Sequence, residues 1–159
     1  MAFDTAKDYL TAKGFADRIY EFTVSSATVE LAAQALGTEP ARIAKSLTFM
    51  GKDGPMMLVC AGDCKVNSGK FKACFGVKAK MLTAQEVHEL VGHDVGGVCP
   101  FGVNEGVAVY LDQSLLAYDI VYPACGSSNS AVKLTPQELC CACNQAPWVD
   151  VCKAREEII

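Results

Sequence analysis

The strongest constraint on the fold of this 159-residue chain is a hairpin signal, the tripeptide Lys52-Asp53-Gly54. It separates two apolar segments, residues 43–50 and 55–62. Asp-Gly tolerates the positive φ angles that tight two-residue turns require, so we expect the two segments to pair as antiparallel strands. The fold therefore has to be built around a β-hairpin.

Helical and strand-like patterns alternate irregularly around this hairpin. Apolar spacing and capping signals predict helices at residues 4–13, 27–36, 67–75, 83–91 and 135–143. Further strands are predicted at residues 18–22 and, on either side of a short connection, within residues 106–122. Ser26 is the predicted N-cap of the second helix and Gly37 its end, and Thr135 and Glu138 have the spacing of a capping box.

This order of elements predicts an α+β fold. Helices packed on a mixed, mostly antiparallel sheet or a partly closed barrel suit the pattern better than a doubly wound parallel sheet. No repeat, linker or low-complexity tract interrupts residues 1–159. We therefore expect one domain, with a monomer as the default state.

Composition narrows the setting in which the chain works. It is 51% hydrophobic and 20% charged, and no apolar run reaches the 18 or so residues of a membrane span. The amphipathic start carries Asp4 and Asp8, unlike a secretory signal. The nine cysteines are odd in number and spread through a chain with ample apolar residues, unlike those of a small disulfide scaffold, so most are expected to be reduced and buried. We expect a cytoplasmic protein with no membrane partner.

Charge is distributed unevenly along the chain. A net charge of −4 leaves no overall basic footprint, which excludes DNA as an expected partner. Between Asp63 and Glu86, however, there is no acidic residue, and the five charged residues there are Lys65, Lys70, Lys72, Lys78 and Lys80. This interval is either a solvated helix face or a local basic surface that steers the phosphate-bearing end of a ligand.

Lys45 stands out in the first strand of the hairpin. Period-two alternation places it on the same face as Ile43, Leu47 and Phe49. A buried ammonium is costly unless it is paired. Lys45 therefore either extends its stem to reach water or projects into a cavity that holds an anion or a carbonyl oxygen.

A glycine-rich loop follows the fourth predicted helix. It contains Gly92, Gly96, Gly97 and Gly102, with Pro100 stiffening its exit. Glycines let the main chain approach a ligand closely, and adjacent main-chain donors can stabilise an oxyanion or hold a water. An ordinary surface turn explains the same residues.

Cysteine and histidine offer two further readings. Cys140 and Cys143 have C-x-x-C spacing, which suits zinc, a redox pair or simple burial; no second ligand pair accompanies them. Cys99 lies inside the glycine loop with His88 and His93 as candidate bases, but neither histidine has a recognisable orienting partner.

Three segments together resemble one family. They are ARIAKSLTF (residues 41–49), VCAGDCKVNSGKF (59–71) and GHDVGGVCPFG (92–102). In order and spacing they are similar to the YbaK/ProX family, aminoacyl-tRNA deacylases related to the editing domain of bacterial prolyl-tRNA synthetases. The similarity runs from about Tyr20 to Leu139.

The resemblance assigns roles to residues of this chain. It implies that Lys45 is the family's strand lysine, a catalytic residue that supplies positive charge near the ester or the terminal phosphate, and that Ser46 is its small polar neighbour. It also implies that Gly96 and Gly97, opposite Lys45 across the pocket, position water or an oxyanion. The substrate contacts that it implies are Tyr20, Ser46, Val98, Cys99, Pro100 and Gly126. Relatives carry an aspartate where this chain has Ala131, which leaves the acyl side chain open.

The implied reaction is hydrolysis of the ester in mischarged tRNA. Water is the implied nucleophile, alone or assisted by the terminal hydroxyl of the tRNA, and no metal or cofactor is required. The implied substrate is tRNA-Pro carrying Ala, Cys, Ser or Thr, because a methylene is worth only about 1 to 3 kcal/mol to a synthetase pocket. The implied partners are the aminoacyl-tRNA acceptor end and prolyl-tRNA synthetase. The alternative is a non-catalytic module that binds the same end.

Overall fold

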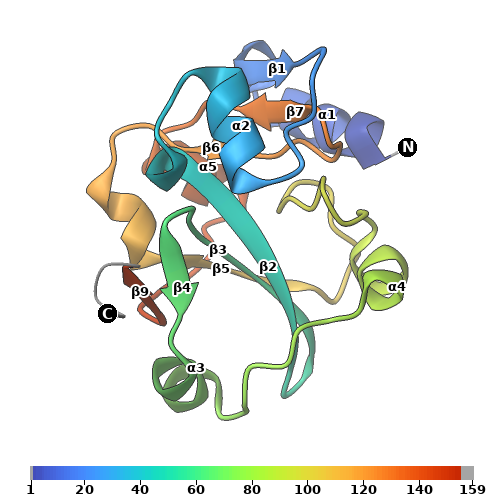
Figure 1. Cartoon of the computed structure of the whole chain (residues 1–159). Helices are drawn as coiled ribbons and strands as arrows, with labels where there is room; N and C mark the ends of the chain where they lie inside the picture. Colours follow the sequence, from blue (N-terminus) through green and yellow to red (C-terminus); the bar gives the residue numbers. More distant parts are fainter. Residues whose placement is uncertain (1, 155–159) are drawn as a thin grey trace.

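A computed structural model describes residues 2–154 of the chain (Figure 1). Its helices are α1 (Ala2–Ala12), α2 (Val29–Leu36), α3 (Ser68–Phe75), α4 (Ala84–Glu86) and α5 (Pro136–Ala142). A π-helical turn, Val87–Val91, continues α4, and 3-10 turns lie at Ala16–Arg18, Pro40–Arg42 and Gln113–Ala117. Each of the five predicted helices is therefore present, with α4 and its π turn together filling the fourth. None of the described helices is long and apolar enough to cross a membrane.

A five-stranded mixed sheet forms the centre of the molecule. Its strands, in spatial order, are β6 (Tyr122–Pro123), β2 (Ile43–Gly51), β3 (Gly54–Ala61), β5 (Ala108–Asp112) and β8 (Trp148–Val149). β2 and β3 form the predicted antiparallel hairpin, whereas the other three pairings of this sheet are parallel. The α+β prediction with a mixed sheet is confirmed. Within residues 2–154 this sheet ends at β6 and β8 and forms no closed barrel.

Two small antiparallel ladders complete the strand set. β1 (Ile19–Glu21) pairs with β7 (Ser130–Val132), and β4 (Cys64–Val66) pairs with β9 (Cys152–Ala154). The first ladder joins a segment near the start of the chain to residues 130–132, and the second joins the middle of the chain to residues 152–154 (Figure 1). Each ladder therefore connects segments that are distant in the sequence.

The hydrophobic core surrounds β3. Residues 57–61 of this strand are fully buried, as expected for a continuous apolar run in the middle of a sheet. On one side Phe71 of α3 lies between Phe49 and Phe75, with ring centroids 4.9 and 4.7 Å away. Such tilted aromatic contacts stabilise a core beyond the area that they bury.

The cap of α2 differs from the prediction. Thr28, not Ser26, is the N-cap: its side chain accepts a hydrogen bond from the Leu31 amide. Ser26 is instead buried, and its own amide donates to the Ser128 carbonyl at 2.6 Å. The predicted end of the helix at Gly37, with φ of 70°, is confirmed. The helix therefore begins two residues later than predicted, because Ser26 forms a tertiary contact that the local sequence does not reveal.

Gly62, directly after β3, is expected to be intolerant of any side chain. A β-carbon there would lie 2.2 Å from the Pro40 carbonyl oxygen and 2.8 Å from Cγ1 of Val29. Gly62→Ala should therefore lower the free energy of unfolding by about 3 kcal/mol, because backbone has to move. Gly76→Ala is the matched control: the space there is open and only its positive φ is unfavourable, at about 1 kcal/mol. Urea unfolding of both variants checks this; equal losses would contradict it.

Candidate functional site

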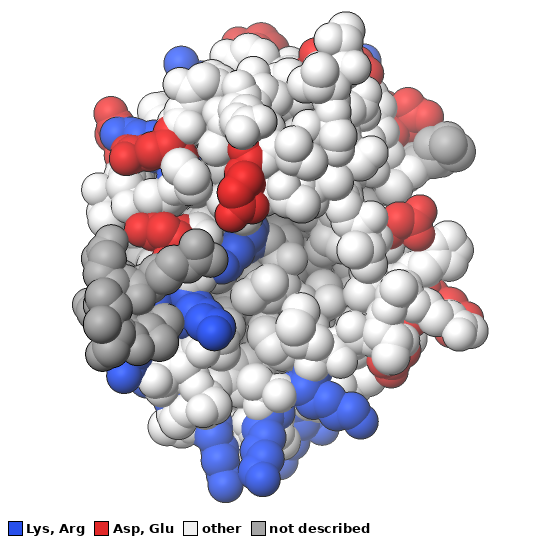
Figure 2. Space-filling model, viewed as in Figure 1, with Lys and Arg blue, Asp and Glu red and all other residues white. Residues whose placement is uncertain are grey.

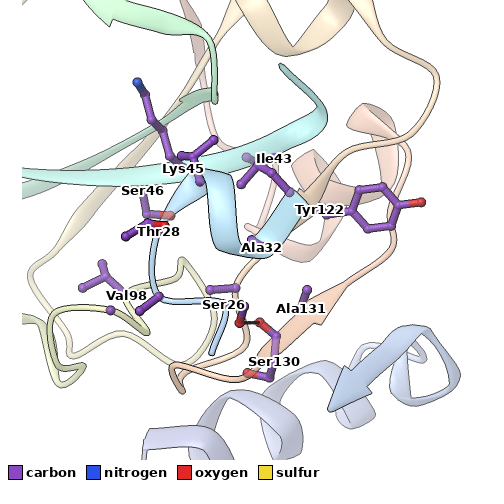
Figure 3. Close-up of a pocket in the computed structure, with 15 residues that line it drawn as sticks. Ser26, Thr28, Ala32, Ile43, Lys45, Ser46, Val98, Tyr122, Ser130 and Ala131 are labelled. Carbon is purple, nitrogen blue, oxygen red and sulfur yellow. Dashed lines mark hydrogen bonds between the residues drawn. The ribbon is translucent and has the colours of Figure 1, made fainter. Parts of the chain in front are cut away.

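A cavity of about 130 Å³ lies between α2, the start of β2, the glycine loop and the segment from β6 to β7 (Figure 3). Residues from all four parts line it: Ser26, Ala27, Thr28, Val29, Ala32, Ile43, Ala44, Lys45, Ser46, Gly96, Val98, Tyr122, Ala124, Ser130 and Ala131. The cavity thus gathers Lys45, Ser46, Gly96 and Val98 from the predicted set. It also gathers Ser26, Thr28 and Ser130, which no sequence motif indicated as site residues.

Main-chain hydrogen bonds hold the walls in place. The Phe22 amide donates to the Asn129 carbonyl at 2.7 Å, and the Ser26 amide donates to the Ser128 carbonyl. These bonds extend the β1–β7 ladder toward the cavity. The segment before α2 and the segment before β7 consequently form one continuous wall.

The two glycines of the loop have different surroundings. Gly96 borders the cavity with φ of 98°, a conformation that side chains rarely adopt. Gly97 packs behind it: a β-carbon there would lie 2.7 Å from the Ser127 nitrogen. Its amide donates to the Asp94 carbonyl at 3.0 Å. Gly96 is therefore the member of the pair whose main chain faces the cavity.

Lys45 contributes its stem to the cavity wall, but its ammonium leaves the cavity. Nζ donates to the carbonyl oxygens of Gly62, at 3.5 Å, and Cys64. In Figure 3 the side chain extends away from the serines. Both alternatives for a lysine on this face are thus partly realised, because the stem is covered while carbonyls compensate the charge. The ammonium does not lie opposite Gly96 across the cavity.

Hydroxyl groups form the polar part of the wall. Ser26 Oγ donates to the Ser130 carbonyl at 3.5 Å, and the Ser130 hydroxyl lies 2.6 Å from that of Ser127. Ser46 Oγ is buried and has no hydrogen-bond partner among the described residues. A buried hydroxyl without a partner is costly, so Ser46 is a position where a bound polar atom would be stabilising.

Several predicted contacts lie outside the cavity lining. Tyr20 is 42% exposed on β1, where it pairs with the cavity residue Ala131. Pro100 borders a second cavity of about 390 Å³, beside Tyr9. Gly126 packs against α1, where a β-carbon would lie 2.4 Å from the Ala2 carbonyl oxygen. Cys99 is fully buried in the core.

The environment of Cys99 keeps it a neutral thiol. Complete burial raises its pKa far above the ordinary value of a thiol. His93 Nε2 lies 3.6 Å from the sulfur but donates to the Phe101 carbonyl at 2.8 Å. Burial also lowers the pKa of His93, so no imidazolium is available to stabilise a thiolate. His88 is on the surface, 2.6 Å from Asp94.

The cysteines in α5 and at its C-terminal end have surroundings that favour a structural role over a reactive one. Cys143 is buried, which raises its pKa to about 12, and Cys140 donates to the Ala146 carbonyl at 3.5 Å. All nine cysteines are free thiols. Within residues 2–154 no three His, Cys, Asp or Glu side chains are grouped to hold a metal ion.

Comparisons with known proteins agree on one family. Residues 23–140 match the family described as "Aminoacyl-tRNA editing domain". The chain is 46% identical to "Uncharacterized protein YwhH" of Bacillus subtilis over 96% of this chain and 98% of that one. It is 29% identical to "Putative Cys-tRNA(Pro)/Cys-tRNA(Cys) deacylase EbsC" of Enterococcus faecalis over 76% of each. A crystal structure titled as that of "a putative trans-editing enzyme for prolyl tRNA synthetase" has a TM-score of 0.86 and 33% identity, covering 96% of this chain and 98% of that one.

Burial of His93 predicts a specific pH dependence of stability. Nε2 carries the proton donated to Phe101, and Nδ1 is buried with no partner among the described residues. In the unfolded chain the imidazole has its ordinary pKa of about 6.5, whereas the folded value is lower. Below about pH 6.5 the unfolded state binds more protons than the folded state. The free energy of unfolding therefore decreases as the pH is lowered, by up to about 1.4 kcal/mol per pH unit.

His93→Gln should remove this part of the pH dependence, because the amide can still donate to Phe101 and does not titrate. Urea unfolding at pH 7.5 and 5.5 measures it for both proteins. An unchanged difference between the two pH values in the variant would show that another group is responsible.

Proposed function

Because the chain belongs to the family of aminoacyl-tRNA editing domains, we propose that it is a free-standing hydrolase that cleaves the ester of mischarged tRNA. The observation that carries this proposal is the small cavity with serine hydroxyls on its wall and a lysine at its rim. The names of the deacylase and trans-editing relatives support the same reaction.

The size of the cavity supports a small acyl group as the cargo. A volume of about 130 Å³ is of the order of cavities that admit one benzene molecule. The side chains of alanine, cysteine, serine and threonine fit within this volume, and the hydroxyls of Ser26 and Ser46 suit a polar side chain or an amino group. We infer tRNA-Pro carrying one of these amino acids as the substrate, with prolyl-tRNA synthetase as the source of the error.

The proposed roles follow from where each group lies. Hydrolysis needs a placed water and stabilisation of the charge on the ester carbonyl. The main chain at Gly96 and the hydroxyl of Ser46 are the polar groups that would hold these atoms. Lys45, whose ammonium lies beyond the rim, would bind the terminal phosphate rather than the ester. A lysine is suited to this as a compact point charge.

A second candidate is a non-catalytic module that binds the charged end of tRNA. It is favoured by the cavity lining, to which residues 2–154 contribute no Asp, Glu, His or Cys side chain that could act as a general base. It predicts binding without turnover. The two candidates therefore differ in one measurable quantity, the rate of ester hydrolysis.

A panel of charged tRNAs tests the proposal. The protein should hydrolyse tRNA-Pro carrying Ala, Cys, Ser or Thr faster than it hydrolyses Pro-tRNA-Pro, and Lys45→Ala should lower kcat/KM by about 100-fold, the order expected for one electrostatic contact. Lys52→Ala, at the exposed turn of the same hairpin, is the matched control. Circular dichroism establishes that Lys45→Ala remains folded. Hydrolysis no faster than the spontaneous rate for every charged tRNA would refute the enzyme.

A second pair of variants separates the proposed hydroxyl from a thiol nucleophile. Ser46→Ala should lower kcat/KM by about tenfold, the effect of losing one hydrogen bond to the reacting group. Cys99→Ala should keep kcat/KM within about twofold, because this thiol is neutral and lies outside the cavity lining. Both are assayed well below their unfolding temperatures. Loss of activity in folded Cys99→Ala would instead favour covalent catalysis.

A further inference from the structure

Two lysines lie directly opposite one another in the ladder of β4 and β9. Lys65 pairs with Lys153, so both side chains leave the same face of the ladder. Like charges at such positions repel one another and destabilise the pairing. Neither lysine has an ion pair or hydrogen bond within the described part of the chain. A cost of this kind is relieved when an anion binds between the two charges.

A third lysine adjoins this pair. Lys70 of α3 donates to the carbonyl of Cys152, the neighbour of Lys153, at 3.4 Å, and pairs with Asp150 at 3.1 Å. Lys65, Lys70 and Lys153 are called the lysine cluster below. Asp150 pairs with Lys70, and Asp63 and Asp112 line the same surface cavity, so Lys65 and Lys153 carry the positive charge of the cluster that has no recorded partner within residues 2–154.

The cluster begins at the rim of the cavity. The Lys45 ammonium binds the carbonyl of Cys64, and Lys65 is the next residue of β4. From there the chain enters α3, which carries Lys70 and the exposed Lys72. Figure 2 shows basic side chains in the hollow at the centre of this face and at its lower end. A basic path therefore leads from Lys45 away from the cavity.

The rest of the molecule is acidic. Residues 64–85 contain five lysines and no Asp or Glu, while the other nine lysines and arginines accompany all 18 carboxylates. A polyanion approaching this protein is repelled by most of its surface and attracted by this part. The path consequently fixes the direction from which such a ligand arrives.

We propose that the lysine cluster binds phosphates of the single-stranded end of the RNA whose ester enters the cavity. This inference rests on the proposed function and adds to it a docking surface. Lys153 lies beyond residues 23–140, which match the family, so the surface includes a part of the chain outside that match. RNA is favoured over other polyanions because the cluster is adjacent in the chain to the residue that holds Lys45.

The experiment compares the double variant Lys65→Ala/Lys153→Ala with the intact protein. One probe is an uncharged RNA hairpin with a single-stranded 3′ end, whose Kd is measured by fluorescence anisotropy at 50 and 200 mM salt. The others are the alanyl ester of the same hairpin and the alanyl ester of adenosine, which lacks phosphates. Lys7→Ala, an exposed lysine of α1, is the matched control.

Loss of two single-strand phosphate contacts lowers the slope of log Kd against log salt by about 1.4. Raising the salt from 50 to 200 mM should increase the Kd of both proteins. The fold increase for the intact protein should be about seven times the fold increase for the variant. KM for the charged hairpin should rise, whereas kcat/KM for alanyl-adenosine should stay within about twofold. The unfolding temperature should not fall, because the substitutions remove a repulsion.

The outcomes separate the docking surface from the proposed function. An unchanged salt slope in the double variant, an equal effect of Lys7→Ala, or no binding of the hairpin by the intact protein would overturn the surface. Absence of hydrolysis of both esters by the intact protein would refute the function, while the binding measurement still decides the surface. An equal loss of kcat/KM on alanyl-adenosine would show that the substitutions act on the cavity and would also overturn it.

Discussion

The antiparallel pairing of β2 with β3 positions the candidate site. It places Lys45 opposite Cys60 and brings the carbonyls that follow β3 within reach of the Lys45 ammonium. Ser46, the next residue, contributes its hydroxyl to the cavity, whereas Lys45 contributes only its stem. A slip of one residue in register would exchange the faces of Lys45 and Ser46, because side chains alternate along a strand. The separation of charge from hydroxyl therefore depends on the hairpin.

Local signals were sufficient for the elements that have local causes. The Asp-Gly turn predicted the hairpin, and the capping box of Thr135 and Glu138 predicted the start of α5; both are present. Ser26 has the same type of local signal and is not a cap, because its amide bonds Ser128 in a segment distant in sequence. Capping propensity describes the hydrogen bond that a side chain can form at a helix start, and tertiary contacts decide whether that bond forms.

The candidate site was only partly predictable for a related reason. The glycine pattern identified the loop, but it did not distinguish Gly96, which borders the cavity, from Gly97, which packs against residues 126–127. Ser26 and Ser130 meet although 104 positions separate them. Nor does a strand pattern indicate that the Lys45 ammonium bonds two carbonyls. Proximity in the sequence placed Cys99 beside the site, whereas the fold directs it into the core.

The position of the Lys45 ammonium connects the cavity with the charge distribution of the surface. A lysine aimed into a small cavity would occupy space needed by an acyl group and would lose its hydration. Held at the carbonyls of Gly62 and Cys64, it leaves the cavity free and presents its charge at the start of the basic path along β4. An acidic protein can then select a small esterified group by cavity shape while it selects the attached polyanion by a few lysines. In the proposed arrangement, recognition of the two parts of one substrate would be divided between two adjacent residues of a single strand, Ser46 and Lys45.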